Sequence, residues 1–105
     1  MMNVKTVYNT TKTIKTGHIL NDAQVLKVTT RDGVDKQVMR MAVKLDGDER
    51  VYHFAEFRSL EKPSLCNKAQ YYKAGRNVEL DIAAESISSD DKRVYMGLTG
   101  FAKLK

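Results

Sequence analysis

Apolar and polar residues alternate along two neighbouring segments, 36–45 and 51–57, and this pattern constrains the fold more than any other feature of the chain. Side chains on a β-strand point alternately to its two faces. In the first segment Met39 and Met41 therefore share one face, while Arg40 points to the other. The alternation predicts two strands, each with one face in the core and one face open to water.

Turn signals divide the first two-thirds of the chain into strand-like segments. Asp32-Gly33 and the run 46–49 (DGDE) are typical of hairpin turns, so the two alternating segments are predicted to pair as a hairpin. Residues 17–30 read as a strand with a bend at Asn21-Asp22. Residues 3–14 are rich in threonine and β-branched residues and read as a first strand or an extended arm.

One short helix and two further strands are predicted after residue 60. Pro63 and Ser64 can open the helix, and Gly75 can close it. Its apolar positions Leu65, Ala69 and Tyr72 recur at spacings of four and three, which predicts that Tyr72 packs in the core. Strict alternation at 78–82 and the segment 94–104 predict the last two strands.

The order of these elements predicts an all-β fold with five strands and one short helix between the third and fourth. It fits the oligonucleotide/oligosaccharide-binding (OB) fold, a five-stranded Greek-key barrel. A split β-barrel and a small sandwich are the alternatives. At 105 residues the chain is expected to form a single domain over 1–105, with 1–14 as its N-terminal strand or arm.

Several classes of protein are disfavoured by composition. No apolar run approaches the length of a membrane helix or a signal peptide, which predicts a cytoplasmic protein with no membrane partner. The single Cys66, with only His18 and His53 beside it, predicts neither a disulfide nor a metal site. Acidic pairs fall in predicted turns, and no phosphate-cradling glycine motif occurs, so we expect no catalysis and no cofactor.

Charge is distributed unevenly along the chain. The formal net charge is +5, and residues 1–45 contain eight basic and three acidic side chains, whereas residues 46–105 contain ten of each. A basic surface of this kind indicates a polyanionic partner, although such charge also serves solubility in small domains.

Five segments together resemble the bacterial and phage single-stranded-DNA-binding proteins. They are GHILNDAQ at 17–24, the turn at 32–33, VMRMAVKL at 38–45, YHFAEFRSL at 52–60 and QYYKAGRNV at 70–78, in the order and spacing that the family shows. The chain departs from the family at Ala23, where a proline is usual, and at Arg58, where a glycine follows the phenylalanine. It also contains no tryptophan and lacks the acidic tail through which such proteins recruit partners.

The resemblance implies an OB-fold protein that coats and protects single-stranded DNA during replication or recombination, without reading its sequence. It also implies a dimer or tetramer. The missing tail favours a compact phage-type or plasmid-type member, acting in the bacterial cytoplasm or an infected host cell. Two alternatives stay open: a protein-interaction or accessory replication subunit on the same fold, and RNA binding.

The first candidate binding residues are Arg40, Lys44, His53 and Phe57, which the alternation places together on the open face of the predicted hairpin. Basic side chains that follow phosphates and aromatic rings that stack bases are what a single-strand groove requires. The assignment depends on register, because a slip of one residue would turn Phe57 inward and Tyr52 outward.

A second set of candidates lies elsewhere in the sequence. The loop before the last strand contains Lys92, Arg93 and Tyr95, where a hairpin could close over the groove. Tyr8, with Lys5, Lys12 and Lys15, could extend the groove or contact another subunit.

Overall fold

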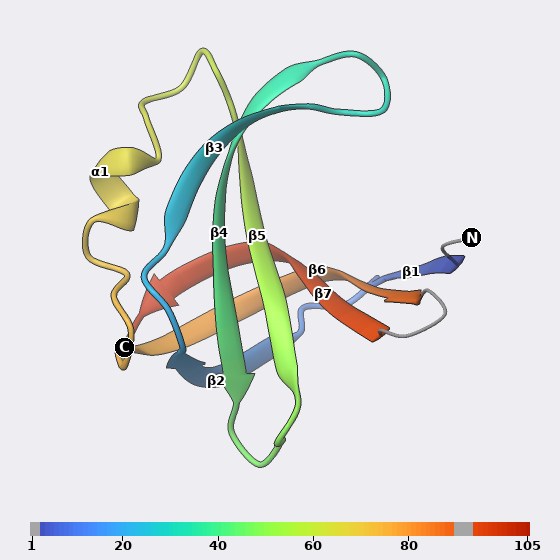
Figure 1. Ribbon diagram of the computed structural model, residues 1–105, viewed down its shortest axis with the longest axis vertical. Coiled ribbons are helices and arrows are strands. Elements are labelled where there is room, and N and C mark those ends of the chain that lie inside the picture. The colour runs from blue at the N-terminus through green and yellow to red at the C-terminus, as the bar shows by residue number, and fades with distance from the viewer. Residues whose placement is uncertain (1–2, 90–93) are drawn as a thin grey trace.

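The computed structural model describes residues 3–89 and 94–105, which form seven strands and one short helix (Figure 1). The elements are β1 (Asn3–Tyr8), β2 (Ile14–Ile19), β3 (Gln24–Thr29), β4 (Asp35–Leu45), β5 (Val51–Ser59), α1 (Cys66–Ala69), β6 (Asn77–Ser89) and β7 (Val94–Leu104). The all-β class is therefore confirmed. Among the described residues no helix is long and apolar enough to cross a membrane.

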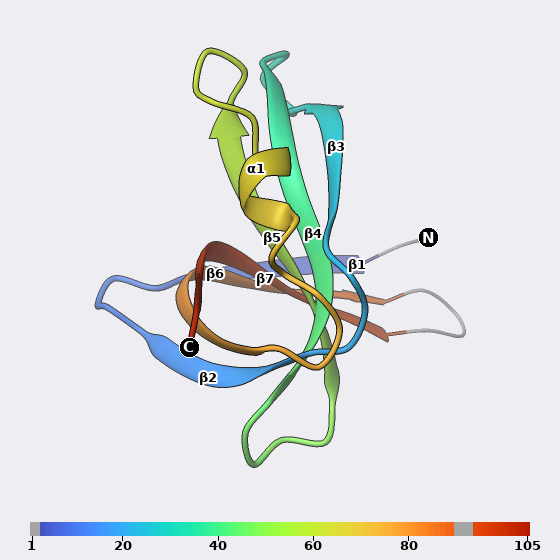
Figure 2. The ribbon, with the colours of Figure 1, turned by 90° about the vertical axis from the view of Figure 1, so that its left-hand side faces the viewer.

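The strand pairings form a closed circuit. β2 pairs with β4, β4 with β5, β5 with β7, β7 with β6, and β6 returns to β2. The β5–β7 pairing is parallel and the other four are antiparallel. Figures 1 and 2 show β4 and β5 running together, with β6 and β7 crossing them.

The prediction of five strands was wrong, because the described residues form seven. The segment 17–30 separates into β2 and β3 at residues 20–23, where the Asn21 side chain accepts a hydrogen bond from the Ala42 backbone N–H at 2.9 Å. β3 then pairs with β4 alone. The N-terminal segment forms β1, which pairs along the end of β6.

The core lies inside the circuit and consists of the inward-facing residues of its strands together with residues from the α1 region. Met39, Tyr52, Phe54, Leu65 and Tyr72 are all buried, at 5% exposure or less. Tyr72 is thus in the core, as predicted, and Met39 and Met41 lie on the core-facing side of β4. α1 is shorter than its apolar spacing suggested, because the chain turns after Gln70, before reaching Tyr72.

Gly100 allows the circuit to bend sharply where β7 meets β6. The pairing slips by one residue between Ile82 and Ala84, which is a β-bulge. A Cβ atom on Gly100 would lie 1.9 Å from the Asp81 carbonyl oxygen, so the two backbones approach too closely for any other residue. Bulges increase the local twist of a strand pair, which helps the sheet to close.

Two buried polar residues attach the segment around α1 to the sheet. Gln37 donates to the carbonyls of Ser59, Lys62 and Pro63 and accepts from the Leu65 N–H at 2.5 Å. The Glu56 carboxylate, in a residue only 2% exposed, accepts from Lys68 Nζ at 2.8 and 2.9 Å and from the Ala102 N–H at 2.8 Å. Glu56 thereby joins β5, α1 and β7.

Candidate functional site

The outer face of β3, β4, β5 and β7 presents cross-strand rows of side chains. Residues directly opposite each other in a sheet share a face. Arg40 lies opposite Ala55, and Phe57 lies opposite Val38. The exposed fraction of Phe57 is 39%, whereas that of Tyr52 is 5%. The register that turns Phe57 outward and Tyr52 inward is therefore confirmed.

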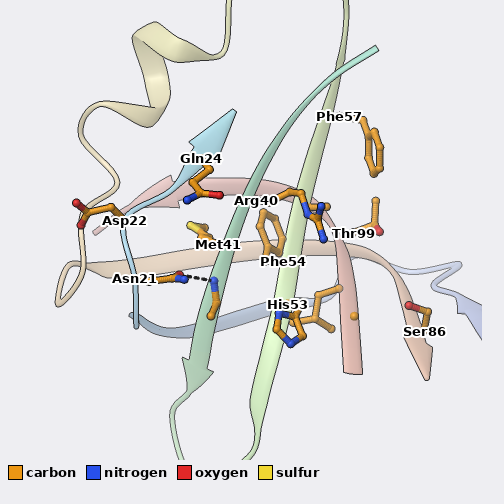
Figure 3. Close-up of a pocket in the computed structure, with 14 residues that line it drawn as sticks. Asn21, Asp22, Gln24, Arg40, Met41, His53, Phe54, Phe57, Ser86 and Thr99 are labelled. Carbon is orange, nitrogen blue, oxygen red and sulfur yellow. Dashed lines mark hydrogen bonds between the residues drawn. The ribbon is translucent and has the colours of Figure 1, made fainter. Parts of the chain in front are cut away.

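Three of the four first candidates border one groove on this face. This part of the groove, which we call the first hollow, has a volume of about 410 Å³ (Figure 3). Lys44 shares the face, opposite Val51, but lies outside the groove. The residues lining the first hollow are Asn21, Asp22, Gln24, Arg40, Met41, Ala42, His53, Phe54, Ala55, Phe57, Ser86, Gly97, Leu98 and Thr99.

A second hollow of about 500 Å³ continues the groove toward the β3–β4 turn. It is lined by Val28, Thr29, Thr30 and Val38, together with three residues of the first hollow, Arg40, Ala55 and Phe57. The two hollows thus meet at Arg40, Ala55 and Phe57 and form one surface across four strands.

The charge of the groove is lower than a basic groove would require. Among the described residues that line either hollow, Arg40 is the one cationic Lys or Arg side chain and Asp22 the one carboxylate. The Asp22 carboxylate already accepts a hydrogen bond from the Ala74 N–H at 2.9 Å and lies 3.8 Å from Lys73 Nζ. Arg40 has no such acidic neighbour across its strand pairs, since it lies opposite Gln24 and Ala55.

Sequence reasoning did not assign the polar walls of the groove. Asn21 lies at the bend between β2 and β3, where its bond to Ala42 orients the side-chain amide (Figure 3). Gln24 and Thr99 come from strands on either side of the hairpin. The Asn21-Asp22 break in the sequence was the signal for the wall at the β2–β3 bend. The wall on β7 depends on its parallel pairing with β5, which no local pattern predicts.

Gly97 lies directly opposite His53 and lines the groove with its backbone. A Cβ atom at this position would come within 2.6 Å of Ser86 Oγ. Glycine in the interior of a strand often marks a place where a ligand or another backbone approaches closely. A larger residue at this position would therefore have to displace the Ser86 side chain, which also lines the groove.

No described side chain of the second set of candidates borders the first or the second hollow. Lys92 and Arg93 lie outside the described residues, and of Tyr95 only the backbone in β7 is described. Tyr8, Lys12 and Lys15 are exposed and border neither hollow. Lys5 lines a third hollow of about 220 Å³ between β1, β6 and β7, which adjoins the first hollow at Ser86, Gly97 and Leu98.

Metal-binding and reactive groups are sparse in the part of the chain that the structure describes. No cluster of three or more His, Cys, Asp or Glu side chains there could hold a metal ion. Cys66 is exposed on α1.

Comparisons with known proteins find no match for this chain among family models, curated proteins or solved structures.

Proposed function

We propose that the closed circuit of β2, β4, β5, β7 and β6 is an OB-fold barrel, in which β2 and β3 together act as its bent first strand. Three features support this: the bend at residues 20–23, the parallel β5–β7 pairing, and the position of α1 between β5 and β6. In such barrels oligonucleotides bind on the second and third strands, which correspond here to β4 and β5.

We further propose that the groove binds single-stranded DNA without reading its sequence. One observation carries the proposal: Phe57 remains 39% exposed on the outer face of the sheet and borders a groove together with Arg40. An aromatic ring stacks on any base, and an adjacent guanidinium attracts the phosphates. The low charge of the described groove implies that stacking contributes more than charge to the affinity.

The biological setting follows from the resemblance of the sequence to the single-stranded-DNA-binding proteins. We propose that the protein coats and protects unpaired DNA during replication or recombination, as a compact phage-type or plasmid-type protein that forms dimers or tetramers. The cytoplasm of a bacterium or of an infected host cell is the corresponding location.

The test is fluorescence anisotropy of a labelled oligo-dT, with duplex DNA and an RNA homopolymer as competitors, at low and moderate salt. We expect tight binding that duplex DNA does not displace and that weakens as salt rises. Phe57→Leu should weaken binding by about 1–3 kcal/mol, the usual contribution of stacking on one aromatic ring. Phe101→Leu is the matched control, since Phe101 is 63% exposed on β7 and borders neither hollow.

A protein partner is the second candidate, and Leu26 is the observation that favours it. Leu26, Val38 and Phe57 form an apolar row across three strands, and Leu26 is 42% exposed. Absence of oligo-dT binding even at low salt would contradict the DNA proposal and favour this partner. Equal displacement by the RNA homopolymer would extend the proposal to RNA.

A further inference from the structure

Phe57 stands at the boundary between the two hollows. It lines both of them, as do Arg40 and Ala55. The residues that belong to one hollow alone lie on opposite sides of this boundary: Ala42 and His53 in the first hollow, and Val28 and Thr30 in the second. Val38 lies directly opposite Phe57 on β4, on the same face of the sheet, and is only 2% exposed.

The spacing of the strand matches the spacing of bases around an inserted ring. Successive outward-facing residues on β5, such as Ala55 and Phe57, are about 6.8 Å apart, twice the rise per residue. Stacked bases follow one another at about 3.4 Å. Two consecutive bases with one ring between them are therefore separated by about 6.8 Å, which is two stacking steps. Because Phe57 borders both hollows, its ring can lie between a base in one hollow and a base in the other.

Arg40 is placed to neutralise the phosphate between those bases. It is exposed, it borders both hollows, and its cross-strand partner on β5 is the small Ala55, which does not cover it. Figure 3 shows the Arg40 side chain between Phe57 and His53. Asp22, the one carboxylate of the described groove lining, belongs to the first hollow alone and already interacts with Lys73 and the Ala74 N–H.

We infer that the groove binds a dinucleotide step, with one base in each hollow, Phe57 between the two bases, and the joining phosphate at Arg40. This inference rests on the proposed binding of single-stranded DNA and adds to it the smallest unit that the site recognises. Affinity then depends on two adjacent bases being present and unpaired. A dinucleotide that lacks one of its two bases occupies only one of the two hollows.

Two competitor probes that share the same phosphate but differ by one base measure the contribution of the second base to the affinity. The dinucleotide d(TpT) and its analogue with one abasic residue are each used to displace labelled oligo-dT from the protein. We expect d(TpT) to compete roughly 5- to 150-fold better, the factor that one base stacking on an aromatic ring provides. Phe57→Leu should reduce that ratio to near one, and Phe57→Tyr should restore it. The Phe101→Leu control should leave it unchanged.

Variants that fill one hollow at a time test the two-sided arrangement. Ala42→Leu adds bulk to the first hollow only, and Val28→Met adds bulk to the second only. Each should bring d(TpT) down to the level of the abasic analogue, while thermal unfolding confirms that both variants are folded.

The outcomes separate the inference from the proposed function. If oligo-dT binds and the two probes compete equally, or only Ala42→Leu has an effect, a single base is bound and the inference is wrong. If oligo-dT itself does not bind to the wild-type protein, the proposed function fails and the dinucleotide site fails with it.

Discussion

Removing the Lys68 ammonium should destabilise the fold more than any change to an exposed charge. Lys68 Nζ donates to both oxygens of the Glu56 carboxylate, whose side chain is 3% exposed. In Lys68→Met the carboxylate stays buried and loses its main partner. Removing one member of a buried ion pair is costly because the other charge is left away from water.

The magnitude follows from the partners that Glu56 keeps. Breaking a buried pair costs about 3–5 kcal/mol. Glu56 still accepts from the Ala102 N–H at 2.8 Å, and an Arg58 guanidinium nitrogen lies 3.9 Å away, so we expect the lower end. A loss of about 3 kcal/mol corresponds to a fall in Tm of roughly 12 °C for a domain of this size.

Replacing the carboxylate partner of the pair, Glu56, should destabilise the fold less. Glu56→Gln keeps an acceptor for the Ala102 N–H, and the Lys68 side chain is 25% exposed, so its ammonium can turn to water. We expect a loss of about 1 kcal/mol, the usual net contribution of one hydrogen bond. The double variant Glu56→Gln/Lys68→Met should be more stable than Lys68→Met alone, because no charge is left buried.

Urea and thermal denaturation at neutral pH measure all three variants. The reasoning is refuted if Lys68→Met costs less than Glu56→Gln, or if the double variant is the least stable of the three. Oligo-dT binding serves as the control, since neither residue borders the groove and folded variants should bind like the wild type.

Three further results are expected. Gly97→Val should weaken oligo-dT binding in the anisotropy assay, because its Cβ would lie 2.6 Å from Ser86 Oγ and its methyl groups would fill the groove; unchanged affinity would contradict the assignment of the groove. Hydrogen bonds from Arg50 and then Tyr52 lower the pKa of Asp48 below its usual 3.8, so its contribution to stability is present above that pH and disappears as the pH falls. Urea unfolding across the acid range should therefore show the wild type and Asp48→Asn converging at low pH. Burial, and then the bond to Asp48, raises the pKa of Tyr52 from 10.0, so stability should fall as the pH rises above 10, and tyrosinate absorbance should report its late ionisation.

The faces of β4 and β5 could be predicted from sequence because their signal is local. Period-2 alternation places Tyr52 and Phe54 on one side and Phe57 on the other, and burial of the first two leaves one register. Arg40 and His53 follow from the same pattern. Local alternation therefore places Phe57 on the face opposite to Tyr52, and the burial of Tyr52 in the structure shows that the Phe57 face is the outer one.

The rest of the groove depends on contacts between residues distant in the chain. Gly97 and Thr99 reach the groove through parallel pairing with His53 and Ala55, more than 40 residues earlier, and alternation within β7 cannot identify its neighbours. The break between β2 and β3 depends on a side-chain bond from Asn21 to β4. The N-terminal strand β1 likewise depends on a distant partner, since it pairs with the end of β6.

Glu56 is an intermediate case. The alternation that places Phe54 inward places Glu56 inward too, but a carboxylate in a core position is stable only with a partner, and spacing alone does not identify Lys68 on the following helix. The sequence therefore predicts that Glu56 points inward, but it does not identify Lys68 as the partner of its charge.

The way in which β7 closes the circuit has a consequence for biosynthesis. β7 is synthesised after both of the strands with which it pairs, β6 on one side and β5 on the other. A nascent chain that lacks β7 exposes the edges of both strands, and unpaired edges are sites of association with other chains. It also lacks the Gly97–Thr99 wall of the groove. The wall of the groove and the pairing that covers these two strand edges therefore form together, when β7 pairs with β5 and β6.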